Sequence, residues 1–111
     1  MNGNLTLGED IADMGGVAIA LDAYHRSLAG RPAAVLDGTT GDQRFFLSCA
    51  QVWRSKSRED ALWRQLAGDP HPPAEPRVND EVRNNNAWYS AFDVKPGDKL
   101  YIDPKDRGRL W

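Results

Sequence analysis

A stripe of apolar residues near the N-terminus constrains the fold more than any other feature of the sequence. Its members recur at steps of three and four residues: Leu7, Ile11, Met14, Ala18, Leu21, Tyr24 and Leu28. This spacing predicts one long amphipathic helix. Thr6 and Glu9 form the pattern of a capping box, which predicts the start of the helix. Gly30 and Pro32 predict its end, because proline cannot continue a helix.

The middle of the chain repeats this helical pattern. Thr40 and Gln43 form a second capping box, and the apolar residues that follow it keep helical spacing through Trp53. Residues 57–60 either continue this helix or begin a new one that stops at Gly68. The aromatic side chains are expected in the core: Phe45, Phe46, Trp53, Trp63, Trp88, Tyr89 and Phe92.

Beyond Gly68 the pattern changes. Residues 69–76 hold four of the seven prolines, which predicts a stiff loop. The asparagines at positions 79 and 84–86 are candidate caps of a short helix that carries Trp88 and Phe92. Residues 95–98 read Lys-Pro-Gly-Asp, a turn signal. The sequence therefore predicts a mainly α fold.

Composition excludes several classes of protein. The 111 residues carry 14 basic and 16 acidic side chains, a formal net charge of −2, which argues against a dedicated nucleic-acid binder. The longest apolar run, residues 17–21, falls far short of the roughly 20 residues of a membrane span. The first residues lack the features of a signal peptide. Cys49 is the single cysteine, so a disulfide within the chain and a multi-cysteine zinc site are excluded.

Three acidic residues cluster at the start of the first predicted helix. Glu9 and Asp13 are four residues apart and share a helix face, with Asp10 beside them. Acids at this end complement the helix dipole, which explains them without any catalytic role. Two glycines follow at positions 15–16, where each costs roughly 1 kcal/mol relative to alanine. The pair favours close packing of another segment beside the acids.

Two further residues are candidates for chemistry. His71 lies in the proline-rich loop, which restricts how its side chain can be aimed. Arg77 is either a plain surface charge or a residue whose planar guanidinium group binds a carboxylate or carbonyl. His25 is expected to be structural or exposed, and Cys49 to be an inert, buried thiol. From the residues alone, both interpretations of His71 and Arg77 stay open.

Motifs along essentially the whole chain resemble one family. They are Asn-Gly-x-Leu-Thr-Leu-Gly-Glu-Asp-Ile-Ala-Asp-x-Gly-Gly (2–16), Asp-Gly-x-Thr (37–40), Gln-x-Phe-Phe (43–46), Ala-x-x-Trp (50–53), Asp-x-His-x-Pro-x-x-x-Arg-Val-Asn (69–79), Ala-Phe (91–92), Lys-Pro-Gly-Asp (95–98) and the terminal Trp111. This order resembles the neprilysin and endothelin-converting-enzyme family of zinc metallopeptidases. The resemblance implies a thermolysin-like (gluzincin) catalytic domain, of which this chain is the helical C-terminal part.

The resemblance also implies a role for each candidate residue. Glu9 corresponds to the third zinc ligand, and Asp13 to the acid that orients a zinc-bound histidine. His71 corresponds to the histidine that stabilises the oxyanion of the tetrahedral intermediate. Arg77 corresponds to the arginine that binds the substrate backbone. The glycine pair then lets this helix pack closely against the helix that bears the other ligands.

The His-Glu-x-x-His motif, which supplies two zinc ligands and the general base in this family, is absent from the sequence. We therefore expect residues 1–111 to be a single domain, a C-terminal fragment without peptidase activity or tight zinc binding of its own. Its partners are then the missing part and, in the complete enzyme, peptide substrates. A homo-oligomer is also expected, because the first helix lacks its usual covering. A periplasmic, secreted or membrane-anchored parent fits the family. The alternative is a stand-alone peptide-binding module.

Overall fold

The computed structural model describes residues 1–110, so the predicted match at Trp111 lies outside the described part. It is mainly α, as predicted. Within residues 1–110 the only β structure is an isolated bridge between Leu36 and Thr39. The helices are α1 (Gly3–Ser27), α2 (Gly41–Val52), α3 (Glu59–Gly68), α4 (Ala74–Val82), α5 (Asn86–Phe92) and the 3₁₀ helix η1 (Pro104–Asp106).

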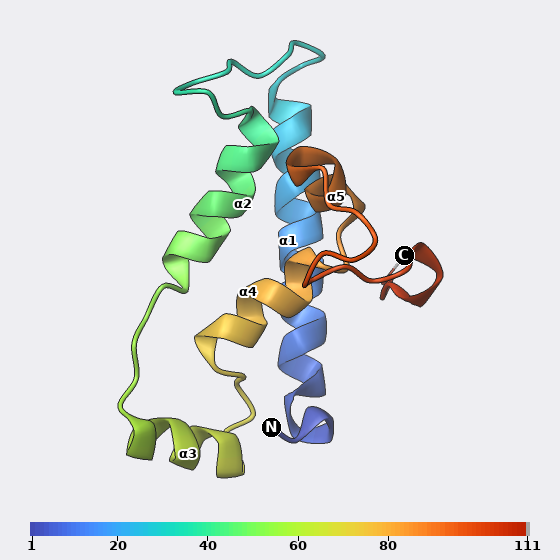
Figure 1. Cartoon of the computed structure of the whole chain (residues 1–111). Coiled ribbons are helices and arrows are strands. Elements are labelled where there is room, and N and C mark those ends of the chain that lie inside the picture. The colour runs from blue at the N-terminus through green and yellow to red at the C-terminus, as the bar shows by residue number, and fades with distance from the viewer. Residues whose placement is uncertain (111) are drawn as a thin grey trace.

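The long helix α1 forms the axis of the molecule (Figure 1). Helix α4 packs across it, and α2 packs on both α4 and α5. Leu21, Phe46 and Val82 are buried where these helices meet, and each contributes about 1.5–3 kcal/mol of hydrophobic stabilisation. Helix α3 lies apart at the end of a linker (Figure 1). No helix of residues 1–110 combines the length and the apolar character that a membrane crossing requires.

The start of α1 differs from the prediction. The helix begins at Gly3, with Asn2 as its N-cap, and the Asn2 side chain accepts a hydrogen bond from the Asn4 N–H at 3.2 Å. Thr6 is instead buried within the helix, and its hydroxyl donates to the Asp10 carboxylate at 3.0 Å. The predicted capping box from Thr6 to Glu9 is therefore wrong, because asparagine four residues earlier is at least as good an N-cap.

The apolar stripe of α1 is covered only along part of its length. Leu21 is buried, whereas Leu7 is 55% exposed and Ile11 is also exposed. The aromatic core prediction fails at Trp63, which is 65% exposed because α3 packs so little against the other helices. Phe92 is likewise exposed at the end of α5, while Phe46 and Tyr89 are buried as expected.

Several local signals act as predicted. Both hydrogen bonds of the second capping box form, from the Gln43 N–H to the Thr40 hydroxyl and from the Thr40 N–H to the Gln43 side chain. At Gly41 a Cβ would meet the Tyr24 hydroxyl and lie 2.6 Å from the Ala33 Cβ, so only glycine fits where α2 begins beside α1. Asn85 caps α5 through the Ala87 N–H.

The proline-rich loop is shorter than predicted. Helix α4 begins at Ala74, so Pro76 lies in its first turn instead of in the loop. Proline is tolerated there because the first N–H groups of a helix have no partner within it. The turn at residues 95–98 forms as predicted, with the Asp98 N–H bonded to the Lys95 carbonyl and Gly97 at a φ of 102°.

Candidate functional site

Two acidic side chains of α1 define one side of the candidate site. Glu9 and Asp13 lie one helical turn apart and therefore project from the same face. The Asp13 carboxylate is 19% exposed, and the Glu9 carboxylate is 37% exposed. Helix α4 crosses α1 at this level (Figure 1), so one of the two acids is covered while the other stays accessible.

Arg77 on α4 provides the opposite side. Its Nη2 lies 2.7 Å from Asp13 Oδ1, and its Nε donates to Asp13 Oδ2, so the pair is bidentate. These hydrogen bonds raise the pKa of Arg77 above its usual value, so the guanidinium stays charged although its side chain is only 13% exposed. The guanidinium also lies over the Trp53 ring, 3.9 Å from its centroid.

His71 reaches the same place from the loop between α3 and α4. Both its backbone N–H and its ring Nδ1 lie 2.9 Å from Asp69 Oδ1. The backbone hydrogen bond, and then the ring, hold the pKa of Asp69 below its usual value. The Gln65 side chain donates to the His71 and Pro72 carbonyls and so ties the loop to α3.

The four predicted site residues therefore converge, although Asp13 and Arg77 are 64 positions apart in the sequence. Glu9 Oε2 lies 3.6 Å from His71 Nε2 and 3.7 Å from Arg77 Nη2. Two cationic or hydrogen-bonding groups thus face one accessible carboxylate. This arrangement can bind a polar group, such as a peptide carbonyl, between His71 and Arg77.

The sequence interpretation missed two members of this site. Trp53 was expected in the core and as part of the Ala-x-x-Trp motif, with no role in the site, yet its ring lies under the Arg77 guanidinium. Asp69 was not singled out, although an aspartate two residues before His71 is the spacing of an Asx turn, a signal that was available. His25, expected to be structural or exposed, lies away from the site, with Nε2 at 2.7 Å from Asp42 Oδ1.

An apolar pocket of about 160 Å³ opens beside Arg77. Helices α1, α2 and α4 contribute its walls, lined by Val17, Cys49, Val52, Trp53, Arg77, Val78, Glu81 and Val82. Cys49 is half-buried and not fully buried as expected. Burial raises the pKa of its thiol, which keeps the thiol protonated near neutral pH. The pocket has the size and character to hold one apolar side chain next to the charged fork of Arg77.

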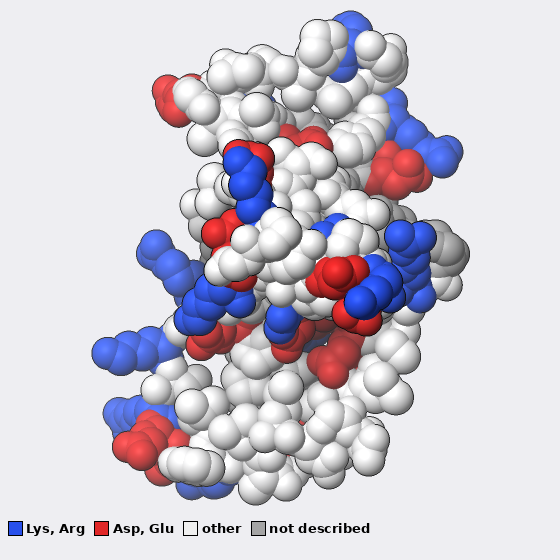
Figure 2. Space-filling model, turned by 45° about the vertical axis from the view of Figure 1, so that its right-hand side comes forward, with Lys and Arg blue, Asp and Glu red and all other residues white. Residues whose placement is uncertain are grey.

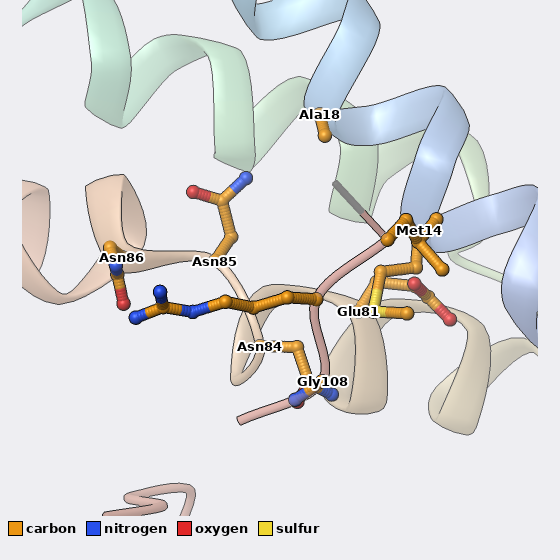
Figure 3. A pocket seen from close by; sticks show the side chains of 9 residues that line it. Met14, Ala18, Glu81, Asn84, Asn85, Asn86 and Gly108 are labelled. Atoms are coloured by element: carbon orange, nitrogen blue, oxygen red, sulfur yellow. The ribbon is translucent and has the colours of Figure 1, made fainter. Parts of the chain in front are cut away.

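Glu81 is a buried carboxyl on α4 that no sequence pattern indicated. It is 4% exposed, and its Oε2 has no hydrogen-bond partner within residues 1–110. Burial, and then the negative charges of Asp13 and Asp10, raise the pKa of Glu81 to about 8. It also lines a cavity of about 340 Å³ together with Met14, Asn84, Asn85 and Gly108 (Figure 3).

The described residues alone do not fit a complete zinc site. No group of three histidine, cysteine, aspartate or glutamate side chains within residues 1–110 is close enough to hold a metal ion. A catalytic zinc site needs three protein ligands. Glu9 does fit as one of them, because its side chain is accessible and His71 Nε2 and Arg77 Nη2 lie 3.6 and 3.7 Å from its Oε2.

Comparison with known proteins shows the family of the chain. The sequence model of peptidase family M13 matches residues 1–108. The chain belongs to peptidase family M13. Among curated M13 relatives, Neprilysin-3 of Drosophila melanogaster is 36% identical over 115 aligned residues, and the neutral endopeptidase of Lactobacillus helveticus is 34% identical over 111. Endothelin-converting enzyme 1 of Bos taurus is 36% identical over 115 residues, so the predicted resemblance to neprilysin and endothelin-converting enzymes is confirmed.

A solved M13 structure extends this match to three dimensions. The zinc metalloprotease Zmp1 of Mycobacterium tuberculosis, crystallised with an inhibitor, superposes with a TM-score of 0.96 at 54% identity over 98% of the chain. The chain spans only 17% of Zmp1, and 14% and 16% of the two curated relatives. The mainly α fold is therefore that of one helical part of a much larger M13 metallopeptidase.

Proposed function

We propose that this chain is the C-terminal part of an M13 zinc metalloendopeptidase domain and supplies the substrate side of its active site. The observation that carries the proposal is the convergence of Glu9, Asp13, His71 and Arg77 from α1, α4 and the loop between α3 and α4. The zinc ion of such an enzyme activates water for peptide hydrolysis. The remaining ligands and the general base would come from the part of the domain that this chain lacks.

Glu9 is the proposed zinc ligand, and Asp13 is the proposed positioning residue beside it. The accessible carboxylate of Glu9 supports the first role, since a ligand must reach a metal held largely by another segment. Asp13 already accepts two hydrogen bonds from Arg77. An ionised carboxylate offers about four lone-pair sites, so Asp13 can also accept the N–H of a histidine ligand.

His71 and Arg77 are the proposed substrate-facing residues. Arg77 uses Nε and Nη2 for Asp13, and within residues 1–110 its Nη1 has no hydrogen-bond partner, which supports a role in binding a substrate carbonyl. The contact between His71 Nδ1 and Asp69 fixes the ring and leaves Nε2 on the side of Glu9. Because the Asp69 carboxylate only accepts, Nδ1 carries a proton, and Nε2 can donate to a developing oxyanion when the ring is doubly protonated.

The outer face of α1 supports the proposed position of the missing part. Gly8 and Gly16 lie two turns apart, and a Cβ at either position would meet open space within residues 1–110. Ile11 and Ile19 are exposed near them. A second helix can approach closely along such a face. Of the predicted glycine pair only Gly16 is open, because Gly15 is buried within the chain.

A chimera tests the proposal. Zmp1 with its matching segment replaced by residues 1–110 of this chain is expected to bind zinc and cleave peptides. Glu9→Gln in the chimera is expected to lower zinc affinity, whereas the matched control Glu59→Gln, an exposed residue of α3, leaves it unchanged. An inactive but folded chimera, or full zinc affinity after Glu9→Gln, contradicts the proposal.

The second candidate function is a stand-alone peptide-binding module. The 160 Å³ pocket beside Arg77 favours it, because this pocket is formed by the chain alone. Titration of apolar peptides followed by tryptophan fluorescence tests it, since Trp53 lines the pocket. A response that is lost in Arg77→Ala supports the module, and the absence of any response counts against it.

A further inference from the structure

A basic linker connects α2 to α3. Arg54, Lys56 and Arg58 alternate with serines there, and all three basic side chains are exposed. The ion pairs within residues 1–110 include none of them. Three cationic side chains in five residues, without partners in the described part, form a local positive strip on a chain whose net charge is −2. We call residues 54–58 the basic linker.

The basic linker begins at the wall of the apolar pocket. Trp53, the residue before it, lines the pocket and lies under the Arg77 guanidinium. An extended chain advances at most about 3.5 Å per residue, so the backbone of Lys56 lies within about 11 Å of Trp53. The side chains of Arg54 and Lys56 are therefore within reach of the two or three residues that flank a side chain held in the pocket, and Arg58 extends the positive charge beyond them.

The acidic side chains around His71 and Arg77 have the opposite sign. Glu9, Asp13 and Asp69 surround His71 and Arg77. At the far end of the linker, Asp60 pairs with Arg64 at 2.9 Å, and Glu59 offsets one of the three linker charges. In Figure 2 the blue and red side chains alternate across the visible face, without one dominant sign. The positive charge of the basic linker is therefore a local feature.

Resting on the proposed function, we propose that the basic linker selects peptides that carry acidic residues next to the apolar residue bound at Trp53. Carboxylates of a bound peptide that lie near the basic linker are attracted by Arg54, Lys56 and Arg58. Exposed pairs of this kind contribute modestly, and together they predict about a fivefold preference at low salt. At about 0.5 M salt, where the Debye length is about 4 Å, the preference disappears.

The experiment uses the 111-residue chain labelled with ¹⁵N and four short capped peptides. Two peptides carry a single leucine with two glutamates either before or after it, and two carry glutamines instead. Titrations followed by amide and indole resonances give separate readouts for the pocket, at Trp53 and Val78, and for the basic linker. The variants are Arg54→Gln/Lys56→Gln/Arg58→Gln and the control Lys95→Gln/Lys99→Gln/Lys105→Gln, which makes the same charge change at exposed residues elsewhere.

The expected result is that one glutamate peptide shifts both sets of resonances and binds about fivefold more tightly than its glutamine counterpart. The linker variant is expected to lose this preference and keep the pocket shifts, while the control variant keeps both. Equal affinities with intact pocket shifts overturn the inference and leave the proposed function standing. Shifts confined to the linker also overturn it. No pocket shift with any peptide overturns the inference and the stand-alone module, whereas only the Zmp1 chimera can overturn the proposed role in the complete enzyme.

Discussion

The buried carboxyl of Glu81 makes the stability of this domain depend on pH in a direction opposite to that of a salt-bridged acid. Its pKa is raised from 4.5 to about 8 in the folded chain, chiefly by burial. Between these values the unfolded chain releases a proton that the folded chain keeps, so stability falls as pH rises. At about 1.4 kcal/mol per pKa unit, the loss reaches up to about 5 kcal/mol above pH 8 and is absent below pH 4.5.

Glu81→Gln removes the ionisable group, so we expect the variant to match or trail the wild type at pH 4 and exceed its stability at pH 9 by several kcal/mol. Urea unfolding followed by tryptophan fluorescence at pH 4, 6, 7.5 and 9 measures the difference. Glu59→Gln in the exposed first turn of α3 is the control and is expected to differ by only a few tenths of a kcal/mol at every pH. If the difference in the free energy of unfolding between wild type and Glu81→Gln is the same at every pH, the reasoning is refuted. A constant difference means that replacing the carboxyl by an amide changes packing or hydrogen bonding and not a titration.

Four further changes test other parts of the molecule. Arg77→Ala leaves the Asp13 carboxylate covered and unpaired and is expected to cost about 2–3 kcal/mol in urea unfolding. Thr40→Ala removes the capping box of α2 and is expected to cost about 1 kcal/mol in the same assay. Gly16→Ala meets no atom within 4 Å and is expected to stabilise the isolated chain by about 1 kcal/mol, yet to lower activity in the Zmp1 chimera. Ile11→Lys with Ile19→Lys is expected to shift a self-associated chain to the monomer in light scattering, because both side chains are exposed and apolar.

Features that depend on a few neighbouring residues were predictable from the sequence. The capping box of α2, the Asn85 cap of α5 and the turn at residues 95–98 each involve groups within four positions of one another. The start of α1 failed for the same reason, because Asn2 and Thr6 both satisfy the N-cap preference and only the burial of Thr6 decides between them. Local signals therefore predicted where helices occur better than where they begin.

Which side of a helix is covered was less predictable. Leu7 and Ile11 continue the apolar stripe of Leu21, yet they are exposed within residues 1–110. Periodicity identifies an apolar face but not the segment that covers it. This chain spans only a sixth or less of the curated relatives it matches. An apolar helix face can therefore be one that packs against residues outside this chain. Trp63 is exposed on a helix with few tertiary contacts, and the same reasoning applies to it.

The grouping of the site residues came from the family resemblance, since no local pattern relates Asp13 to Arg77 across 64 positions. The pairing gives that grouping a physical basis. Asp13 fixes the fork of Arg77 with two of its lone-pair sites and retains others on the same carboxylate. Glu9 and Asp13 lie one turn apart on the same helix. A segment that places a histidine beside Glu9 therefore also places that histidine near Asp13. With the proposed roles, the Asp13 carboxylate would keep the proposed zinc ligand and the proposed substrate-binding arginine in register, which accounts for the pairing of Asp13 with Arg77 while Glu9 stays accessible.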